Sequence, residues 1–141
     1  MKRMRRGLSL LLSLALLGTL LVVPAYAVTP MEEILGVYEG YYYAAQGQTG
    51  VTLTVYQENS QVKAIFDFYN LPNRTNAKEG KFYMDVRYEN GQYHFDAGDW
   101  IQRPSGYYTV DLQLTLHDYV LSGEVFASTG TYSFYAEKPN D

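Results

Sequence analysis

Residues 81–99 read KFYMDVRYENGQYHFDAGD and predict a β-hairpin. Apolar and polar residues alternate on both sides of Asn90-Gly91, and this dipeptide is the strongest short signal for a two-residue type I′ turn. The cross-strand pairs that follow from such a turn are Tyr88–Tyr93, Val86–Phe95 and Met84–Ala97. Apolar residues therefore meet on one face, as expected of a sheet with one buried side.

Short alternating runs of this kind extend over most of the chain. Val, Tyr, Phe and Thr recur with period two between Gly, Asn and Pro, and no segment after Leu35 has a convincing helical period. We expect eight strands, at residues 36–43, 51–57, 61–69, 81–89, 92–99, 107–117, 120–127 and 131–137. Residues 28–35 are a lead-in, in which 31–35 fold as a turn of helix or run extended. The predicted fold class is all-β, with one domain over residues 36–138.

Short turns between consecutive strands predict an antiparallel up-and-down meander. Turns at residues 58–59, 118–119 and 129–130 keep the apolar faces in phase with the 90–91 hairpin. Eight strands in this order close most economically into a small β-barrel, because closure removes exposed edges; a two-sheet β-sandwich is the alternative. An eight-stranded barrel is either filled by side chains or holds one small ligand. The predicted inward residues are large and leave both possibilities open: Phe66, Phe68, Phe82, Met84, Tyr88, Tyr93, Phe95, Leu112, Leu114, Tyr132 and Phe134.

The first 27 residues differ in composition from the rest. Four basic residues between positions 2 and 6 precede an uncharged, mostly apolar run that ends in Ala25-Tyr26-Ala27. This pattern is typical of a cleaved secretory signal peptide. An uncleaved membrane anchor is the alternative, because about 20 apolar residues can span a bilayer. We therefore expect a secreted protein, which contacts a membrane only if residues 1–27 stay attached.

Composition excludes several kinds of function. The chain has 141 residues, 15 tyrosines, no cysteine and a formal net charge of −4. Four of the 11 basic residues and none of the 15 acidic ones lie in the first 27 positions, so the remaining 114 residues carry seven basic and 15 acidic side chains, a formal charge of −8. An acidic surface disfavours nucleic acid, because phosphate binding rests on Lys and Arg. Without cysteine, disulfides, thiolate metal sites and cysteine nucleophiles are excluded.

Three aspartates form a candidate site on the outward face of the predicted sheet. The hairpin register places Asp85 opposite Asp96, with Asp111 one strand further. Like charges directly opposite each other destabilise a strand pair, so the arrangement requires an explanation. The carboxylates could hold a hard cation such as Ca²⁺ or perform acid–base catalysis. A solvated acidic face, screened by salt and offset by a nearby arginine, is the simpler interpretation.

The segment from residue 100 to 108, WIQRPSGYY, is expected to form a loop between two strands and contains the only tryptophan. Aromatic faces beside hydrogen-bonding groups suit recognition of a sugar or peptide, and loops at a barrel mouth commonly carry binding sites. The candidate ligand-binding residues are Trp100, Arg103, Tyr107 and Tyr108. The alternative role is structural, with Trp100 closing one barrel end and Arg103 pairing with an acid.

Several segments together resemble a group of secreted β modules of bacteria. They are the pattern Gly-x-Tyr-x-Gly-x-Tyr at 36–42, the strands TLTVY (52–56) and AIFDFY (64–69), and WIxRPSGY (100–107). The resemblance implies a bacterial secreted protein and brings no known activity, so no catalytic residue follows from it. More loosely, the opening strand and the strand order resemble avidin- and lipocalin-type barrels, in architecture only.

These observations predict a secreted, non-enzymatic β-barrel module that binds an extracellular glycan or protein through the 100–108 loop. Three alternatives stay open: a small hydrolase that uses Asp85, Asp96 or Asp111, a carrier of lipid or of a small apolar ligand, and a structural or inhibitory surface domain. The two histidines match no catalytic or metal-binding spacing, and no nucleophile motif is present. We accordingly expect no cofactor.

Overall fold

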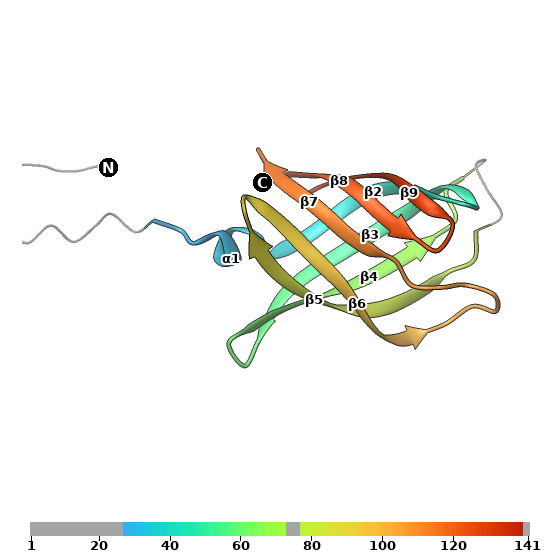
Figure 1. Cartoon of the computed structure of the whole chain (residues 1–141), viewed down its shortest axis with the longest axis horizontal. Coiled ribbons are helices and arrows are strands. Elements are labelled where there is room, and N and C mark those ends of the chain that lie inside the picture. Colours follow the sequence, from blue (N-terminus) through green and yellow to red (C-terminus); the bar gives the residue numbers. More distant parts are fainter. Residues whose placement is uncertain (1–26, 73–76, 140–141) are drawn as a thin grey trace, which may run out of the picture.

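A computed structural model describes residues 27–72 and 77–139. Within these ranges the chain forms one short helix, α1 (Pro30–Glu33), and eight strands that close into an antiparallel barrel (Figure 1). The strands are β2 (Gly36–Ala44), β3 (Gly47–Glu58), β4 (Gln61–Tyr69), β5 (Gly80–Glu89), β6 (Gln92–Gln102), β7 (Asp111–His117), β8 (Val120–Ala127) and β9 (Gly130–Glu137). Each strand pairs with its neighbour in sequence, and β2 pairs with β9. The predicted up-and-down barrel is confirmed, whereas the predicted signal peptide lies, except for Ala27, outside the described residues.

Two of the predicted turns are confirmed. Asn90 and Gly91 have φ of 52° and 80°, as a type I′ turn requires, and Tyr88 pairs with Tyr93. The turn at residues 118–119 also has two positive φ angles and joins β7 to β8 in the predicted register. The hairpin signal in the sequence therefore fixes these two pairings correctly.

The other two predicted turns are each wrong by one residue. The β3–β4 turn lies one residue later than expected, at 59–60, and the β8–β9 turn one residue earlier, at 128–129. The pairing shifts by two residues as a result, so Val125 opposes Tyr132 instead of Phe134. Because side chains alternate with period two, a shift of two leaves each residue on its predicted face.

The strand β6 continues beyond its predicted end, through Trp100 to Gln102. Its register against β5 shifts between the pair Met84–Ala97 and the pair Phe82–Trp100, and shifts again after Trp100. Such β-bulges insert an extra residue into one strand and redirect the side chains that follow. They place Trp100 opposite Phe82 on the inward face. The expectation that Trp100 lies in a loop is therefore wrong.

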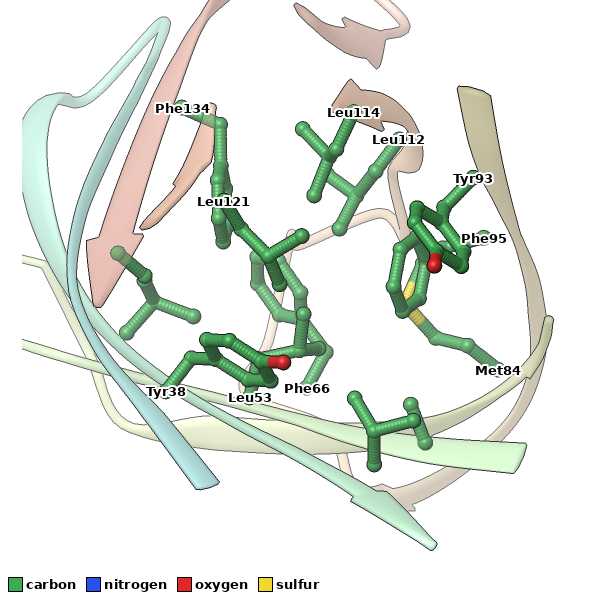
Figure 2. Packing of buried hydrophobic residues seen from close by; sticks show 14 of the residues in the cluster. Tyr38, Leu53, Phe66, Met84, Tyr93, Phe95, Leu112, Leu114, Leu121 and Phe134 are labelled. Atoms are coloured by element: carbon green, nitrogen blue, oxygen red, sulfur yellow. The ribbon is translucent and has the colours of Figure 1, made fainter. Parts of the chain in front are cut away.

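The barrel interior is filled by apolar side chains from all eight strands, which point inward from the wall (Figure 2). Two rings at its centre, Phe66 and Phe82, stack with 4.9 Å between centroids. Most of the predicted inward residues are buried: Phe66, Phe68, Phe82, Met84, Tyr93, Phe95, Leu112, Leu114 and Phe134. Tyr88 is exposed and Tyr132 half-buried, because each lies beside a turn at a barrel end.

One end of the barrel is closed by α1 and the residues after it. Thr29 and Glu32 form a capping box, in which each side chain bonds the other residue's backbone N–H. Ile34, directly after the helix, is completely buried in the core, and its carbonyl oxygen accepts a 2.9 Å hydrogen bond from the Tyr38 hydroxyl. The lead-in thus folds as a helical turn. Strand β9 also ends on this side, and the long β6–β7 loop lies at the opposite end (Figure 1).

Candidate functional site

The end of the barrel opposite α1 holds a cavity of about 430 Å³, here called the mouth cavity. Its floor is formed by the core rings of Phe66 and Phe82, and its walls include the turn at 45–46, part of the β6–β7 loop and the turn at 128–129. The described residues that line it are Tyr42, Ala44, Ala45, Gln46, Phe66, Phe68, Phe82, Gly106, Tyr107, Tyr108, Thr109, Val110, Ala127, Ser128 and Thr129. This volume and apolar lining are typical of small-molecule sites. The interior is therefore filled toward α1 and hollow at the mouth.

Two of the four predicted binding residues, Tyr107 and Tyr108, line the mouth cavity. The ring of Tyr107 stacks on Phe68 with 5.4 Å between centroids and 13° between planes. Its hydroxyl oxygen accepts a 3.0 Å hydrogen bond from the backbone N–H of Lys78. Tyr108 is 68% exposed. Tyr107 therefore forms part of the wall, and Tyr108 part of the rim.

The other two predicted residues, Trp100 and Arg103, support this segment from outside the cavity. Trp100 packs edge-on against Phe82, with 5.2 Å between ring centroids. The guanidinium carbon of Arg103 lies 5.6 Å from the ring centre of Trp100 and 5.8 Å from that of Tyr108. Arg103 Nε also donates a 3.0 Å hydrogen bond to the carbonyl oxygen of Tyr107. The structure thus brings all four residues together: Trp100 packs on the core, and Arg103 holds the β6–β7 loop against Trp100.

A polar group on the wall opposite Tyr107 is missing from the sequence prediction. The side-chain amide of Gln46 donates hydrogen bonds to the Tyr42 hydroxyl, at 3.2 Å, and to the Thr49 hydroxyl, at 3.0 Å. Thr49 is completely buried. The sequence predicts a connection at residues 44–50, whereas the chain turns tightly before Gly47, whose φ of 97° a glycine adopts easily. That glycine is the signal which could have located the turn and brought Gln46 to the cavity.

The Tyr42 hydroxyl stays protonated in this environment. Burial raises the pKa of Tyr42 above its ordinary value; the hydrogen bond from Gln46 opposes this effect and the hydroxyl of Tyr107 adds to it. Tyr42 and Tyr107 line the same cavity. Tyr42 keeps its hydroxyl hydrogen at any physiological pH.

The three candidate carboxylates lie on the outer face of the barrel, and none of them lines the mouth cavity. Asp85 faces Asp96 as predicted, but Asp85 Oδ1 is 3.1 Å from Lys63 Nζ and Asp96 Oδ2 is 2.9 Å from Arg87 Nε. Asp111 accepts a hydrogen bond from a backbone N–H of β6. In residues 27–72 and 77–139, no group of three or more His, Cys, Asp and Glu side chains is placed to hold a metal ion. The flanking cations account for the like-charge pair.

Two further hollows lie away from the mouth. One, of about 590 Å³, is beside α1 and includes Glu32, Lys63 and Asp85; the other, of about 360 Å³, includes Tyr83 and Asp99. Both are lined mainly by exposed or half-buried polar side chains. The mouth cavity differs from them because core rings form its floor and predicted binding residues form its wall.

The fold and the cavity together define a small closed β-barrel with a ligand-sized hollow at its open end. Comparisons with protein-family models, with curated proteins and with solved structures found no match for this chain. No helix in the described part of the chain has the length and apolar character needed to cross a membrane. Function is therefore argued from the mouth cavity itself.

Proposed function

We propose that this protein is a non-enzymatic binding module that takes a small, largely apolar ligand in the mouth cavity. The observation that carries the proposal is an aromatic cavity of about 430 Å³ whose wall includes the loop predicted to bind. A ligand that covers the rings of Phe66, Phe68 and Phe82 removes apolar surface from water, which contributes about 25 cal/mol per Å². This function corresponds to the carrier alternative of the sequence analysis.

A glycan or protein partner is the second candidate, and the rim of the cavity favours it. Tyr108 is 68% exposed, and the Arg103 guanidinium between Tyr108 and Trp100 extends the aromatic surface beyond the cavity. A larger partner could insert one group into the mouth and rest on this rim. Both candidates place the module outside the cell, on the signal-peptide pattern of residues 1–27 and the resemblance to secreted bacterial modules. The hydrolase alternative gains no support, because Asp85, Asp96 and Asp111 lie away from the cavity.

The test is a fluorescence titration with N-phenylnaphthylamine, a neutral apolar dye. We expect saturable binding with one site per chain. Ala127 lines the cavity at the end of β8, so Ala127→Phe should fill it and abolish binding. The matched control is Thr115→Phe, which adds the same ring at an exposed position of β7 and should bind normally.

Two results would contradict the proposal: no saturable binding by the wild-type chain, or equal binding by Ala127→Phe and Thr115→Phe. Tyr108→Ala separates the two candidates. Its affinity for the dye should stay within about twofold of the wild-type affinity, since the dye sits below the rim. Its binding to an immobilised cell-wall glycan should be lost if the rim is the contact surface.

A further inference from the structure

We propose that the occupant of the mouth cavity carries a neutral carbonyl oxygen, which accepts hydrogen bonds from the hydroxyls of Tyr42 and Tyr107. The inference rests on the proposed function, because it names the chemical class of the ligand for the same cavity. A ketone, ester, amide or quinone group attached to an apolar or aromatic body has this chemistry.

The first argument is that both hydroxyls have a hydrogen left to donate. A phenol oxygen can accept and donate at the same time. Tyr42 accepts from the Gln46 amide and Tyr107 accepts from the Lys78 backbone N–H. Within residues 27–72 and 77–139, neither hydroxyl donates to a protein acceptor. Tyr42 is only 3% exposed, so an acceptor supplied by a ligand would satisfy a donor that is nearly shut off from bulk water.

The second argument is that the two tyrosines belong to different elements and line one space. Tyr42 lies on β2, in the wall formed by the β2–β3 hairpin, and Tyr107 lies in the β6–β7 loop. Both side chains line the same cavity of about 430 Å³, so a ligand held in it can reach both hydroxyls. A carbonyl oxygen has two lone pairs and can accept one hydrogen bond from each hydroxyl.

The third argument concerns charge. Among the described residues, the lining of the mouth cavity contains no charged side chain, so a carboxylate bound there would be buried without a cationic partner from them, at a large cost in desolvation. Lys78 contributes only its backbone N–H to the Tyr107 hydroxyl. The net charge of the chain, −4, also disfavours an anion. The acceptor is therefore neutral.

The experiment compares three probes of nearly equal size: acetylnaphthalene, which has a carbonyl oxygen, ethylnaphthalene, which has none, and naphthoate, which has a carboxylate. Their affinities for the full chain are measured by displacement of N-phenylnaphthylamine. We expect acetylnaphthalene to bind most tightly and naphthoate most weakly. Tyr42→Phe and Tyr107→Phe should each weaken acetylnaphthalene about two- to tenfold and leave ethylnaphthalene unchanged, since each removes one hydrogen bond.

The matched control is Tyr93→Phe, which removes a hydroxyl from the inner face at the closed end and should leave all three affinities unchanged. Melting temperatures establish that each variant is folded, and the two mouth variants lie on different elements, so failure of one to fold leaves the other informative.

Equal binding of acetylnaphthalene and ethylnaphthalene, or equal losses for both probes in Tyr42→Phe and Tyr107→Phe, would overturn the inference while the proposal of binding in the mouth cavity stands. Tightest binding of naphthoate would overturn it in favour of a carboxylate ligand. Failure of every probe to bind would instead refute the proposed function.

Discussion

The hydroxyl of Tyr93 donates a 2.7 Å hydrogen bond to the carbonyl oxygen of Pro30, 63 residues earlier in the chain. Tyr38 makes a second bond of this kind, to the carbonyl of Ile34. Residues of β6 and β2 thus hold α1 and the residue that follows it in the closed end of the barrel. These bonds supplement the few backbone hydrogen bonds of a single-turn helix, such as the 3.2 Å bond from the Ile34 N–H to the Pro30 carbonyl.

Removal of the Tyr93 hydroxyl should weaken the closed end. Tyr93→Phe removes this bond and leaves the Pro30 carbonyl with only the 3.2 Å bond from the Ile34 backbone N–H, so we expect the free energy of unfolding to fall by about 1 kcal/mol. Urea denaturation measures this value. Tyr88→Phe, the same change in the exposed ring that packs against Tyr93, should cost less than about 0.5 kcal/mol. Equal losses in the two variants would show that the bond to Pro30 contributes nothing.

The same residue predicts how stability depends on alkaline pH. Burial, followed by the negative charge of Glu33 and the hydroxyl of Tyr88, raises the pKa of Tyr93 to about 12. In the unfolded chain a tyrosine ionises near pH 10. The unfolded state therefore loses its proton first, and stability should fall as pH rises from about 10 to about 12. The free energy of unfolding, measured by denaturation at several pH values in this range, should fall less steeply with pH for Tyr93→Phe than for the wild type. Identical pH slopes for the two proteins would contradict the prediction.

Closure of the barrel depends on a glycine in β2. Gly40 pairs with Ala136 of β9, and a Cβ added at Gly40 would collide with the Tyr135 carbonyl oxygen and lie 2.6 Å from Ala136 Cα. Because both contacts are backbone atoms, the collision can be relieved only if β2 and β9 separate. We expect Gly40→Ala to cost more than about 3 kcal/mol or to prevent folding.

The control for this substitution is Gly91→Ala. A Cβ at Gly91 meets nothing within 4 Å, and only the positive φ of 80° opposes it, at a cost of about 1 kcal/mol. Thermal unfolding of the two variants measures the difference. Similar melting temperatures would mean that β2 and β9 are not tightly paired.

Arg103 should determine how firmly the β6–β7 loop is held. Arg103→Ala removes the hydrogen bond to the Tyr107 carbonyl and the contacts with the Trp100 and Tyr108 rings. We expect faster amide hydrogen exchange in residues 103–110 and a loss of about 1 kcal/mol in stability. Arg87→Ala, which removes two outer-face ion pairs, should leave exchange in this loop unchanged. Unchanged exchange in Arg103→Ala would contradict the holding role.

Asp67 should destabilise the barrel at neutral pH. Its Oδ1 is buried without a hydrogen-bond partner, and desolvation raises the pKa of this carboxyl, with Lys81 opposing the shift and Glu79 adding to it. A raised pKa means that the folded state binds the proton more readily, so the cost of the charge is present above that pKa and disappears as pH falls. Asp67→Asn should therefore raise the melting temperature near neutral pH, with a smaller gain in acid.

The control for Asp67 is Asp85→Asn. Asp85 has a cationic partner in Lys63. This variant should show no gain, because an exposed ion pair contributes little and its loss relieves no burial. A melting temperature of Asp67→Asn at or below that of the wild type would contradict the prediction.

Alternation and turn residues are enough to predict the barrel, because both act locally. Asn90-Gly91 requires positive φ and so fixes its hairpin, while Ser60, with φ of 70°, gives no such signal, and the β3–β4 turn is predicted one residue too early. That error leaves the inward face intact, since a register shift of two residues preserves the period.

The mouth cavity is not predictable in the same way. The bulges that bring Trp100 inward depend on how β6 meets β5, which the sequence of β6 alone does not contain. Tyr42 and Tyr107 are 65 positions apart by residue number and share the cavity only because the barrel closes. The segment at residues 100–108 could be identified as a candidate from its residue types. Tyr42 and Gln46, which line the same cavity, could be identified only from the three-dimensional arrangement.

Because β2 pairs antiparallel with β9, the start of β2 and the end of β9 both lie at the closed end of the barrel, and this placement matters for attaching the protein to a surface. Thr29 leads into α1 at the closed end, and the backbone N–H of Lys138 bonds the carbonyl oxygen of Tyr119, in a turn at that same end. A purification tag or surface linker joined to either end of the described chain would therefore leave from the side away from Tyr108. Attached to a biosensor chip through such a linker, the molecule would present its mouth to the flowing solution.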